Sequence, residues 1–183
     1  MLVTCTKPEA ACRQLDVAIA LLFAESDALA VRTLAAAAHG VLADLVESVK
    51  PGKSWRSKAL EDSGISKKDA LGILNSAQNY LKHADQDPDG VLSFEEEEND
   101  HVLFLATLEC GELQYPLTVS MEGFQIWFLA SYPEKIGLAS ELTRKARLIL
   151  PKFETLSRRE RFVKGAELIE KAKTLKAGRK NAV

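Results

Sequence analysis

Residue types that build metal centres and disulfide frameworks are scarce in this chain. Its 183 residues include only 3 cysteines and 3 histidines. The cysteines, Cys5, Cys12 and Cys110, are odd in number and form no Cys-x-x-Cys pair, so they indicate neither a disulfide framework nor a zinc site. The sequence also lacks a Gly-rich phosphate loop, a His-Glu-x-x-His motif and a Gly-x-Ser-x-Gly motif. These absences favour a non-catalytic protein over a metalloenzyme, a nucleotide-binding enzyme or an esterase.

Long apolar runs are missing as well. Runs such as VAIALLFA fall far short of the ~20 residues that span a bilayer. The opening stretch MLVTCTKPEAAC lacks the basic-then-apolar pattern of a secretory signal. We therefore expect a soluble, reduced, cytoplasmic protein with no membrane partner.

The charge is unevenly distributed along the chain, although the net charge is only −2. From Arg144 onwards there are 13 Lys/Arg and 4 Asp/Glu, a balance of +9, and the preceding residues carry −11. A basic end on an acidic body can bind an anionic partner, or the two parts can attract each other. The run Arg158-Arg159-Glu160-Arg161 could contact nucleic-acid phosphates, but no aromatic residues interleave with it for base stacking. We expect a solvated helix face here, with nucleic-acid binding through the basic C-terminal helix as the alternative.

Helical periodicity dominates the sequence, and no segment alternates convincingly as a strand does. Apolar residues recur at intervals of three and four, which is typical of helices that pack on a core. The stretches with this pattern are residues 13–24, 25–49, 66–84, 101–113, 120–132, 141–150 and 154–175. The apolar content of 101–113 also leaves a strand possible there. The expected fold is an all-α, single-domain bundle of five to seven helices.

The domain boundaries follow from where the helical pattern begins and ends. Residues 1–12 are expected to form a flexible tail, residues 13–175 a single helical domain, and residues 176–183 a second flexible tail. Within the domain, residues 139–175 are the basic C-terminal helices. Two apolar stripes are expected in the core: Met121, Phe124, Trp127 and Phe128 in one, and Phe162, Val163, Ala166, Ile169 and Ala172 in the other.

The stretch DQDPDGVLSFEE, residues 85–96, has the residue order of an EF-hand calcium loop. Such a loop takes side-chain oxygens from its first, third and fifth positions, a backbone carbonyl from the seventh, often a water-mediated ligand from the ninth and a bidentate Glu from the twelfth. The corresponding residues are Asp85, Asp87, Asp89, Val91, Ser93 and Glu96, with Gly90 at the sharp turn. A calcium-binding module is therefore one alternative, and calcium is the one cofactor that the sequence suggests.

Other features of the same stretch argue against calcium. Pro88 fixes a backbone angle and removes an N–H in a loop that relies on internal hydrogen bonds. EF-hands usually occur in pairs, and no second acidic loop is present. The following helix should pack apolar residues back on the preceding one, but Glu97, Asp100 and His101 stand there. A turn at Asp-Pro-Asp-Gly and a capping box over residues 93–96 account for the same residues without a metal.

Arg32 and His39 have the spacing of another kind of site. In RTLAAAAH six residues separate the two, which resembles the Arg–His pair of HEPN domains, a family of small helical bundles. The resemblance implies RNA binding or cleavage, because a positioned His can act as acid or base and an Arg can hold phosphate. Asn79 and His83 resemble the same pattern later in the chain, with Gln78 in place of the Arg. On an Ala-rich helix, a partly buried, hydrogen-bonded His is the commoner outcome.

A further resemblance covers most of residues 13–134. The stretches that carry it are TLAAAAHGVLADL, QNYLKHADQDPDG and GFQIWFLASYPE, which together resemble a group of uncharacterised bacterial helical proteins. The resemblance implies a helical, cytoplasmic, single-domain protein and adds no chemistry. In that group the KHAD-x-DP part resembles a helix end and turn more than a calcium site.

Together these observations favour a non-catalytic binding or structural protein. Its expected working surface is a helix end where a Lys, a His and Asp residues gather: Lys82, His83, Asp85 and Asp87. A second copy of the chain or another protein is a plausible partner, because many small helical domains associate through apolar faces. The calcium-binding and HEPN-like interpretations remain the alternatives.

Overall fold

A computed structural model of the chain describes residues 2–62, 76–77, 79–80, 85 and 88–180. These residues form eight α-helices, seven of them at least seven residues long, and no strand, which confirms the all-α expectation. The strand alternative for 101–113 is wrong, because that stretch lies almost wholly within a helix. The elements are α1 (Lys7–Phe23), α2 (Ala28–Val49), α3 (Trp55–Asp62), α5 (Glu98–Glu112), α6 (Val119–Ser131), α7 (Pro133–Ile136), α8 (Glu141–Ile149), the 3₁₀ helix η1 (Phe153–Thr155) and α9 (Arg158–Lys180).

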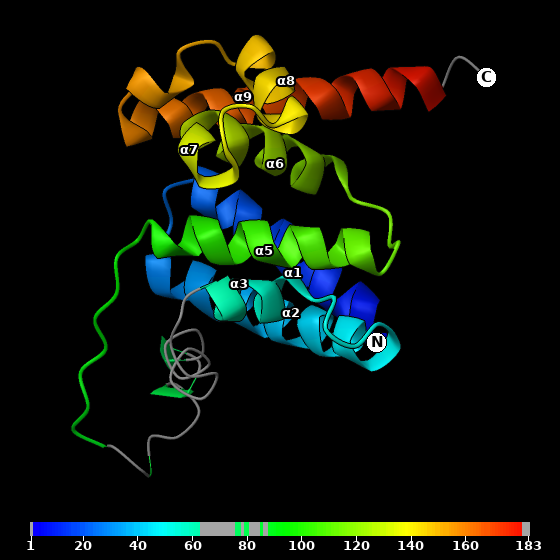
Figure 1. The fold of residues 1–183 in the computed structure, drawn as a ribbon, viewed down its shortest axis with the longest axis vertical. Coiled ribbons are helices and arrows are strands. Elements are labelled where there is room, and N and C mark those ends of the chain that lie inside the picture. Colours follow the sequence, from blue (N-terminus) through cyan, green and yellow to red (C-terminus); the bar gives the residue numbers. More distant parts are fainter. Residues whose placement is uncertain (1, 63–75, 78, 81–84, 86–87, 181–183) are drawn as a thin grey trace.

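The helices form two groups that meet along α1, α5 and α6. In the first group α2 packs against both α1 and α5, with α3 beside α5. In the second group α6 packs against α8 and α9 (Figure 1). Contacts of α1 with α6 and α9, and of α5 with α6, join the groups around one core. The predicted aromatic stripe lies in that core, with Phe124, Trp127 and Phe128 buried.

Helix α1 begins at Lys7, which corrects the expected flexible tail over residues 1–12. Thr6 and Glu9 form a capping box, in which the Glu9 carboxylate accepts the Thr6 N–H at 2.7 Å and the Thr6 hydroxyl accepts the Glu9 N–H. Pro8 is tolerated because it stands in the first turn, where its missing N–H has no helical partner. Ala11 and Cys12 are buried, so this added turn contributes to the core.

Helix α9 extends to Lys180, which corrects the expected tail over residues 176–180; residues 181–183 lie outside the described part of the chain. Its C-terminal end projects beyond α6 (Figure 1). Phe162 and Ile169 are buried as expected, but Val163 is 51% exposed. Val163 therefore does not belong to the buried face of this helix, although the sequence pattern placed it there.

The helix expected over residues 66–84 lies mostly outside the described residues. Within it, residues 76–77 and 79–80 are helical, Ala77 is buried, and Tyr80 is 40% exposed.

Helix α2 is long and apolar enough to cross a membrane by length and composition, the one such helix in the described part of the chain. Half of its most apolar stretch is buried within the bundle, as in the core helix of a soluble protein. This is weak evidence for a membrane span.

Candidate functional site

The predicted calcium loop is only partly covered by the structure. Asp85, Asp89, Ser93 and Glu96 are exposed, and so is Val91. Asp87, like Lys82 and His83 of the predicted binding surface, lies outside the described residues. Across the described ranges, no group of three or more His, Cys, Asp or Glu side chains is placed to hold a metal ion. Calcium binding by this loop therefore stays a prediction.

The expected capping box over residues 93–96 is wrong. Helix α5 begins at Glu98, and Glu97 at its N-cap makes no side-chain cap hydrogen bond. The Glu98 carboxylate instead accepts the N–H of Glu95, at 3.4 Å. The turn therefore continues beyond the point where the sequence pattern placed the helix start.

The polar start of α5 is packed into the bundle, which the sequence pattern does not indicate. Asp100 is fully buried, and its carboxylate accepts hydrogen bonds from the Tyr132 hydroxyl at 2.6 Å and from Arg158 at 2.6 and 3.0 Å. The His101 ring packs 5.3 Å from the rings of Phe128 and Tyr132. Polar residues thus do the packing that the EF-hand comparison assigned to apolar ones, and they pack against α6 and α9.

Burial and pairing act against each other at this cluster. Burial raises the pKa of the Asp100 carboxyl, and the hydrogen bonds from Arg158 offset part of that rise. Burial would lower the pKa of Arg158, but the hydrogen bond and charge of Asp100 raise it. The permanently protonated guanidinium favours the ionised form of the carboxyl, and its two terminal nitrogens donate to both carboxylate oxygens, so the contact is bidentate.

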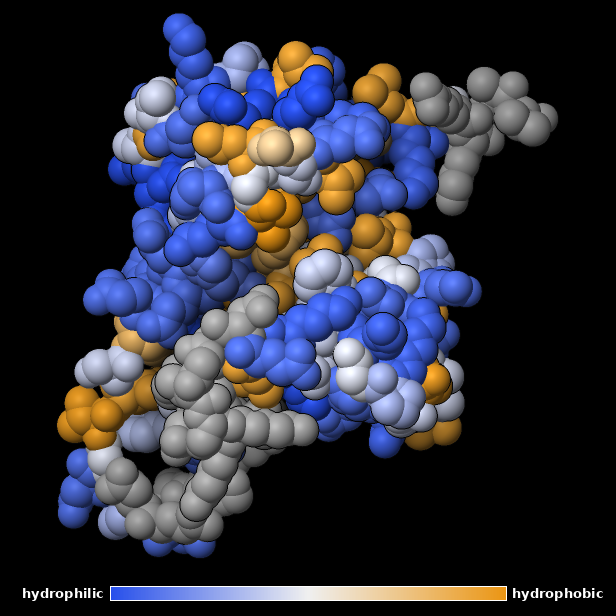
Figure 2. Space-filling view, in the orientation of Figure 1, coloured by the Kyte–Doolittle hydropathy of each residue, from blue (hydrophilic) through white to orange (hydrophobic). Residues whose placement is uncertain are grey.

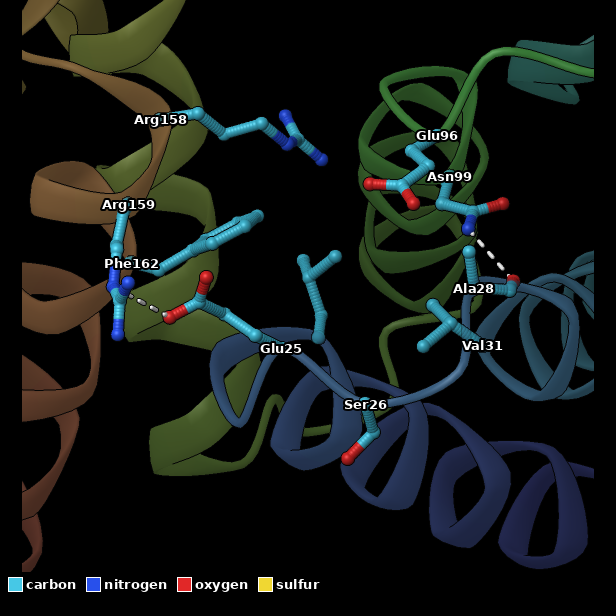
Figure 3. A pocket seen from close by; sticks show the side chains of 10 residues that line it. Glu25, Ser26, Ala28, Val31, Glu96, Asn99, Arg158, Arg159 and Phe162 are labelled. Atoms are coloured by element: carbon cyan, nitrogen blue, oxygen red, sulfur yellow. Dashed lines mark hydrogen bonds and ion pairs between the residues drawn. The ribbon is translucent and has the colours of Figure 1, made fainter.

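A pocket of about 370 Å³ adjoins this cluster, where the end of α1 meets the starts of α2, α5 and α9. Its apolar wall consists of Leu22, Val31 and Phe162. Figure 3 shows Arg158 and Arg159 of α9 on one side of the pocket, and the residues preceding and beginning α5 on the other. The four elements that form it are far apart in the sequence, so no local motif marks it.

The arginines that line the pocket are paired. Arg158 binds Asp100 and also lies 3.8 Å from the Glu97 carboxylate. Arg159 pairs with Glu25 at 3.5 Å and is otherwise exposed. The sequence pattern predicts a solvated basic face for both, and for Arg158, whose side chain is only 21% exposed, that expectation is wrong.

The acceptors on the α5 side of the pocket are not all paired. Glu96 has no ion-pair or hydrogen-bond partner for its carboxylate among the described residues. Asn99 is 1% exposed; its Nδ2 donates to the Ala28 carbonyl at 2.9 Å, and within the described chain its Oδ1 accepts no hydrogen bond. The Glu96 carboxylate points into the pocket, whereas the Oδ1 of Asn99 points away from it (Figure 3), so the pocket carries one free carboxylate beside an apolar wall.

Arg32 and His39, the HEPN-like pair, are both buried within the bundle. Arg32 pairs with Glu98, and its guanidinium stacks 4.6 Å from the Phe94 ring centre. His39 is 4% exposed, and its Nε2 faces the Glu109 carboxylate at 4.0 Å. His83 lies outside the described residues. The HEPN comparison requires an open cleft, whereas both side chains are buried and neither lines the pocket described above.

We expect His39 to make the protein sensitive to acid. Burial, and then the charge of Arg56, lower the pKa of His39 from 6.5 to about 4. Between pH 6.5 and about 4, His39 is therefore protonated in the unfolded chain but neutral in the folded protein. The free energy of unfolding falls as the pH drops through this window, by about 3 kcal/mol in all. Burial raises the pKa of Glu109, which acts with the opposite sign.

Replacing the histidine isolates its contribution to acid sensitivity. The free energy of unfolding of His39→Gln, measured with urea between neutral pH and pH about 4, should depend less on pH than that of the wild type. Parallel curves for the two proteins would show that His39 does not titrate in this way.

Hydrophilic side chains cover much of the molecular surface (Figure 2). Hydrophobic groups appear among them on the upper part, where α7 and α8 lie; the exposed apolar residues of this region are Ile136, Leu138, Leu142, Leu148 and Ile149. Association through apolar faces, with a second copy or another protein, remains a prediction.

No family model, curated protein or solved structure matches this chain. The resemblance to bacterial helical proteins is therefore a hypothesis, and the pocket must be interpreted from its own chemistry.

Proposed function

We propose that the protein is a non-catalytic binding protein whose ligand site is the pocket between α1, α2, α5 and α9. The observation that carries this proposal is a pocket of about 370 Å³ with an apolar wall and the free Glu96 carboxylate. Sites for small molecules are concave, with volumes from about 300 Å³ upwards, and combine apolar walls with polar groups that orient the ligand. This pocket has both, although six of its ten lining residues are polar or charged.

The wall of the pocket is suited to an apolar group of modest size. Leu22 and Val31 are buried side chains of α1 and α2, held in place by the core packing behind them. The Arg158 guanidinium lies over the ring of Phe162 in α9, 4.5 Å from the centre of that ring. Rigid walls favour binding because little side-chain freedom is lost when a ligand enters.

The proposal predicts saturable binding of small aromatic compounds at this pocket. Titration with phenethylamine and with 2-phenylethanol should shift the amide NMR signals of pocket residues, with the weak affinity expected of ligands this small. Glu96→Trp, at an exposed position whose side chain points into the pocket (Figure 3), should abolish binding by filling it.

Ser48→Trp provides the matched control, because Ser48 is also exposed on the bundle surface but does not line this pocket. Binding should survive in that variant. If neither compound gives saturable shifts in the wild type, or if Glu96→Trp binds both as well as Ser48→Trp does, the pocket is not the ligand site.

A further inference from the structure

We infer that the ligand of this pocket is a small amphipathic amine, bound as its ammonium form. The inference rests on the proposed function, since it names the ligand class of the same pocket. It follows from the charges and hydrogen-bond acceptors that remain once every paired group is accounted for.

The positive charges around the pocket are already neutralised. Arg158 faces two carboxylates, that of Asp100 at 2.6 Å and that of Glu97 at 3.8 Å. Arg159 faces Glu25 at 3.5 Å. The carboxylate of Glu96 therefore adds a negative charge that no described residue balances. A cation is favoured in such a site over an anion or a neutral molecule.

The free carboxylate fits the same kind of ligand. Glu96 stands just before the N-cap of α5, and its carboxylate points into the pocket, toward the side that carries Arg158 (Figure 3). The Oδ1 of Asn99 points the other way, so Glu96 is the acceptor that a ligand in the pocket meets. An ammonium group carries three N–H donors and no acceptor, so it can donate to the Glu96 carboxylate.

An apolar body fits the rest of the ligand. Leu22, Val31 and Phe162 form the apolar part of the lining and offer no polar side-chain atom. A short aliphatic or aromatic body would cover them, which adds hydrophobic contact to the charge interaction. A pocket volume of about 370 Å³ lies near the lower end of the range for small-molecule sites and has room for one ring with a short chain.

The test compares three probes with nearly the same body: phenethylamine, 2-phenylethanol and phenylacetate. In calorimetric or NMR titrations the amine should bind about fivefold more tightly than the alcohol, as expected for one partly solvated ion pair, and the carboxylate should bind most weakly. Glu96→Gln should remove the advantage of the amine. Glu95→Gln, an equally exposed neighbour that does not line the pocket, should retain it.

The outcomes separate this inference from the proposed function. If the alcohol or the carboxylate binds as well as the amine, the pocket binds ligands but the amine assignment is overturned; binding of none of the three overturns both. Because Glu96 is also the last position of the predicted calcium loop, Asp89→Asn is included. Loss of amine binding in that variant would overturn the assignment to this pocket, since Asp89 does not line it.

Discussion

Asp100→Ala is expected to lower the free energy of unfolding by about 3–5 kcal/mol. The substitution removes a fully buried carboxylate that binds Tyr132 and both terminal nitrogens of Arg158. The guanidinium of Arg158 would then remain half-buried without its main counter-charge, and this uncompensated charge is the larger part of the cost. Urea unfolding at neutral pH, followed by circular dichroism, measures the change.

A double-mutant cycle separates the pair from its surroundings. Arg158→Met should also destabilise the protein, and the double variant should lose less stability than the sum of the single variants, because it leaves no charge unpaired. Glu97→Ala is the matched control: its side chain is 55% exposed and lies 3.8 Å from the same guanidinium, so a change below about 1 kcal/mol is expected. Strict additivity of Asp100→Ala and Arg158→Met would contradict the coupling.

Gly165→Val is expected to destabilise the protein by about 3 kcal/mol, the upper end of the range for overpacking a core. A Cβ at this position would lie 2.4 Å from a ring atom of Phe23 and 2.6 Å from one of Trp127. Neither ring can move aside easily, because the Trp127 Nε1–H donates to the Arg161 carbonyl at 2.8 Å and both rings pack edge-on against each other. Thermal and urea unfolding give the magnitude.

The same substitution at Gly178 serves as the control for helix propensity. Gly178 stands on the same helix, and a Cβ added there would meet no atom within 4 Å, so Gly178→Val adds a side chain without a clash. Since valine has a higher helix propensity than glycine, the control should be neutral or slightly stabilising. Equal effects at both positions would show that the close approach of α9 to Trp127 does not limit stability.

Helix positions could be predicted from the sequence wherever one element's own residues determine them. The helical stretch expected over residues 25–49 contains α2, and Asp27 at its N-cap is a residue type favoured there; its carboxylate accepts the Ala30 N–H at 2.9 Å. The Thr-x-x-Glu pattern of the Thr6–Glu9 capping box is also visible in the sequence. These residues were nevertheless expected to form a tail, because the apolar periodicity begins after them. Local hydrogen bonds of this kind depend on spacings of three or four residues, which a sequence displays directly.

The candidate site could not be predicted in the same way. Asp100 was counted as evidence against packing, because its partners Tyr132 and Arg158 lie 32 and 58 residues further along the chain. No periodicity indicates which distant arginine will neutralise a buried carboxylate. Glu96 was identified as a candidate ligand, although for calcium, and its position beside Leu22 and Phe162 depends on how α1, α5 and α9 come together.

The bidentate contact between Asp100 and Arg158 also restricts the position of α9 along its own axis. A guanidinium fork meets a carboxylate in one plane and one direction, so both bonds are lost if α9 slides along its axis by one helical turn, about 5.4 Å. Apolar side chains at the same interface would tolerate such a slip far better, since dispersion contacts have no direction. We therefore expect this ion pair to fix the position of α9 along its axis relative to α5. A variant with apolar residues at both positions can be stable and yet sample more than one position of its last helix.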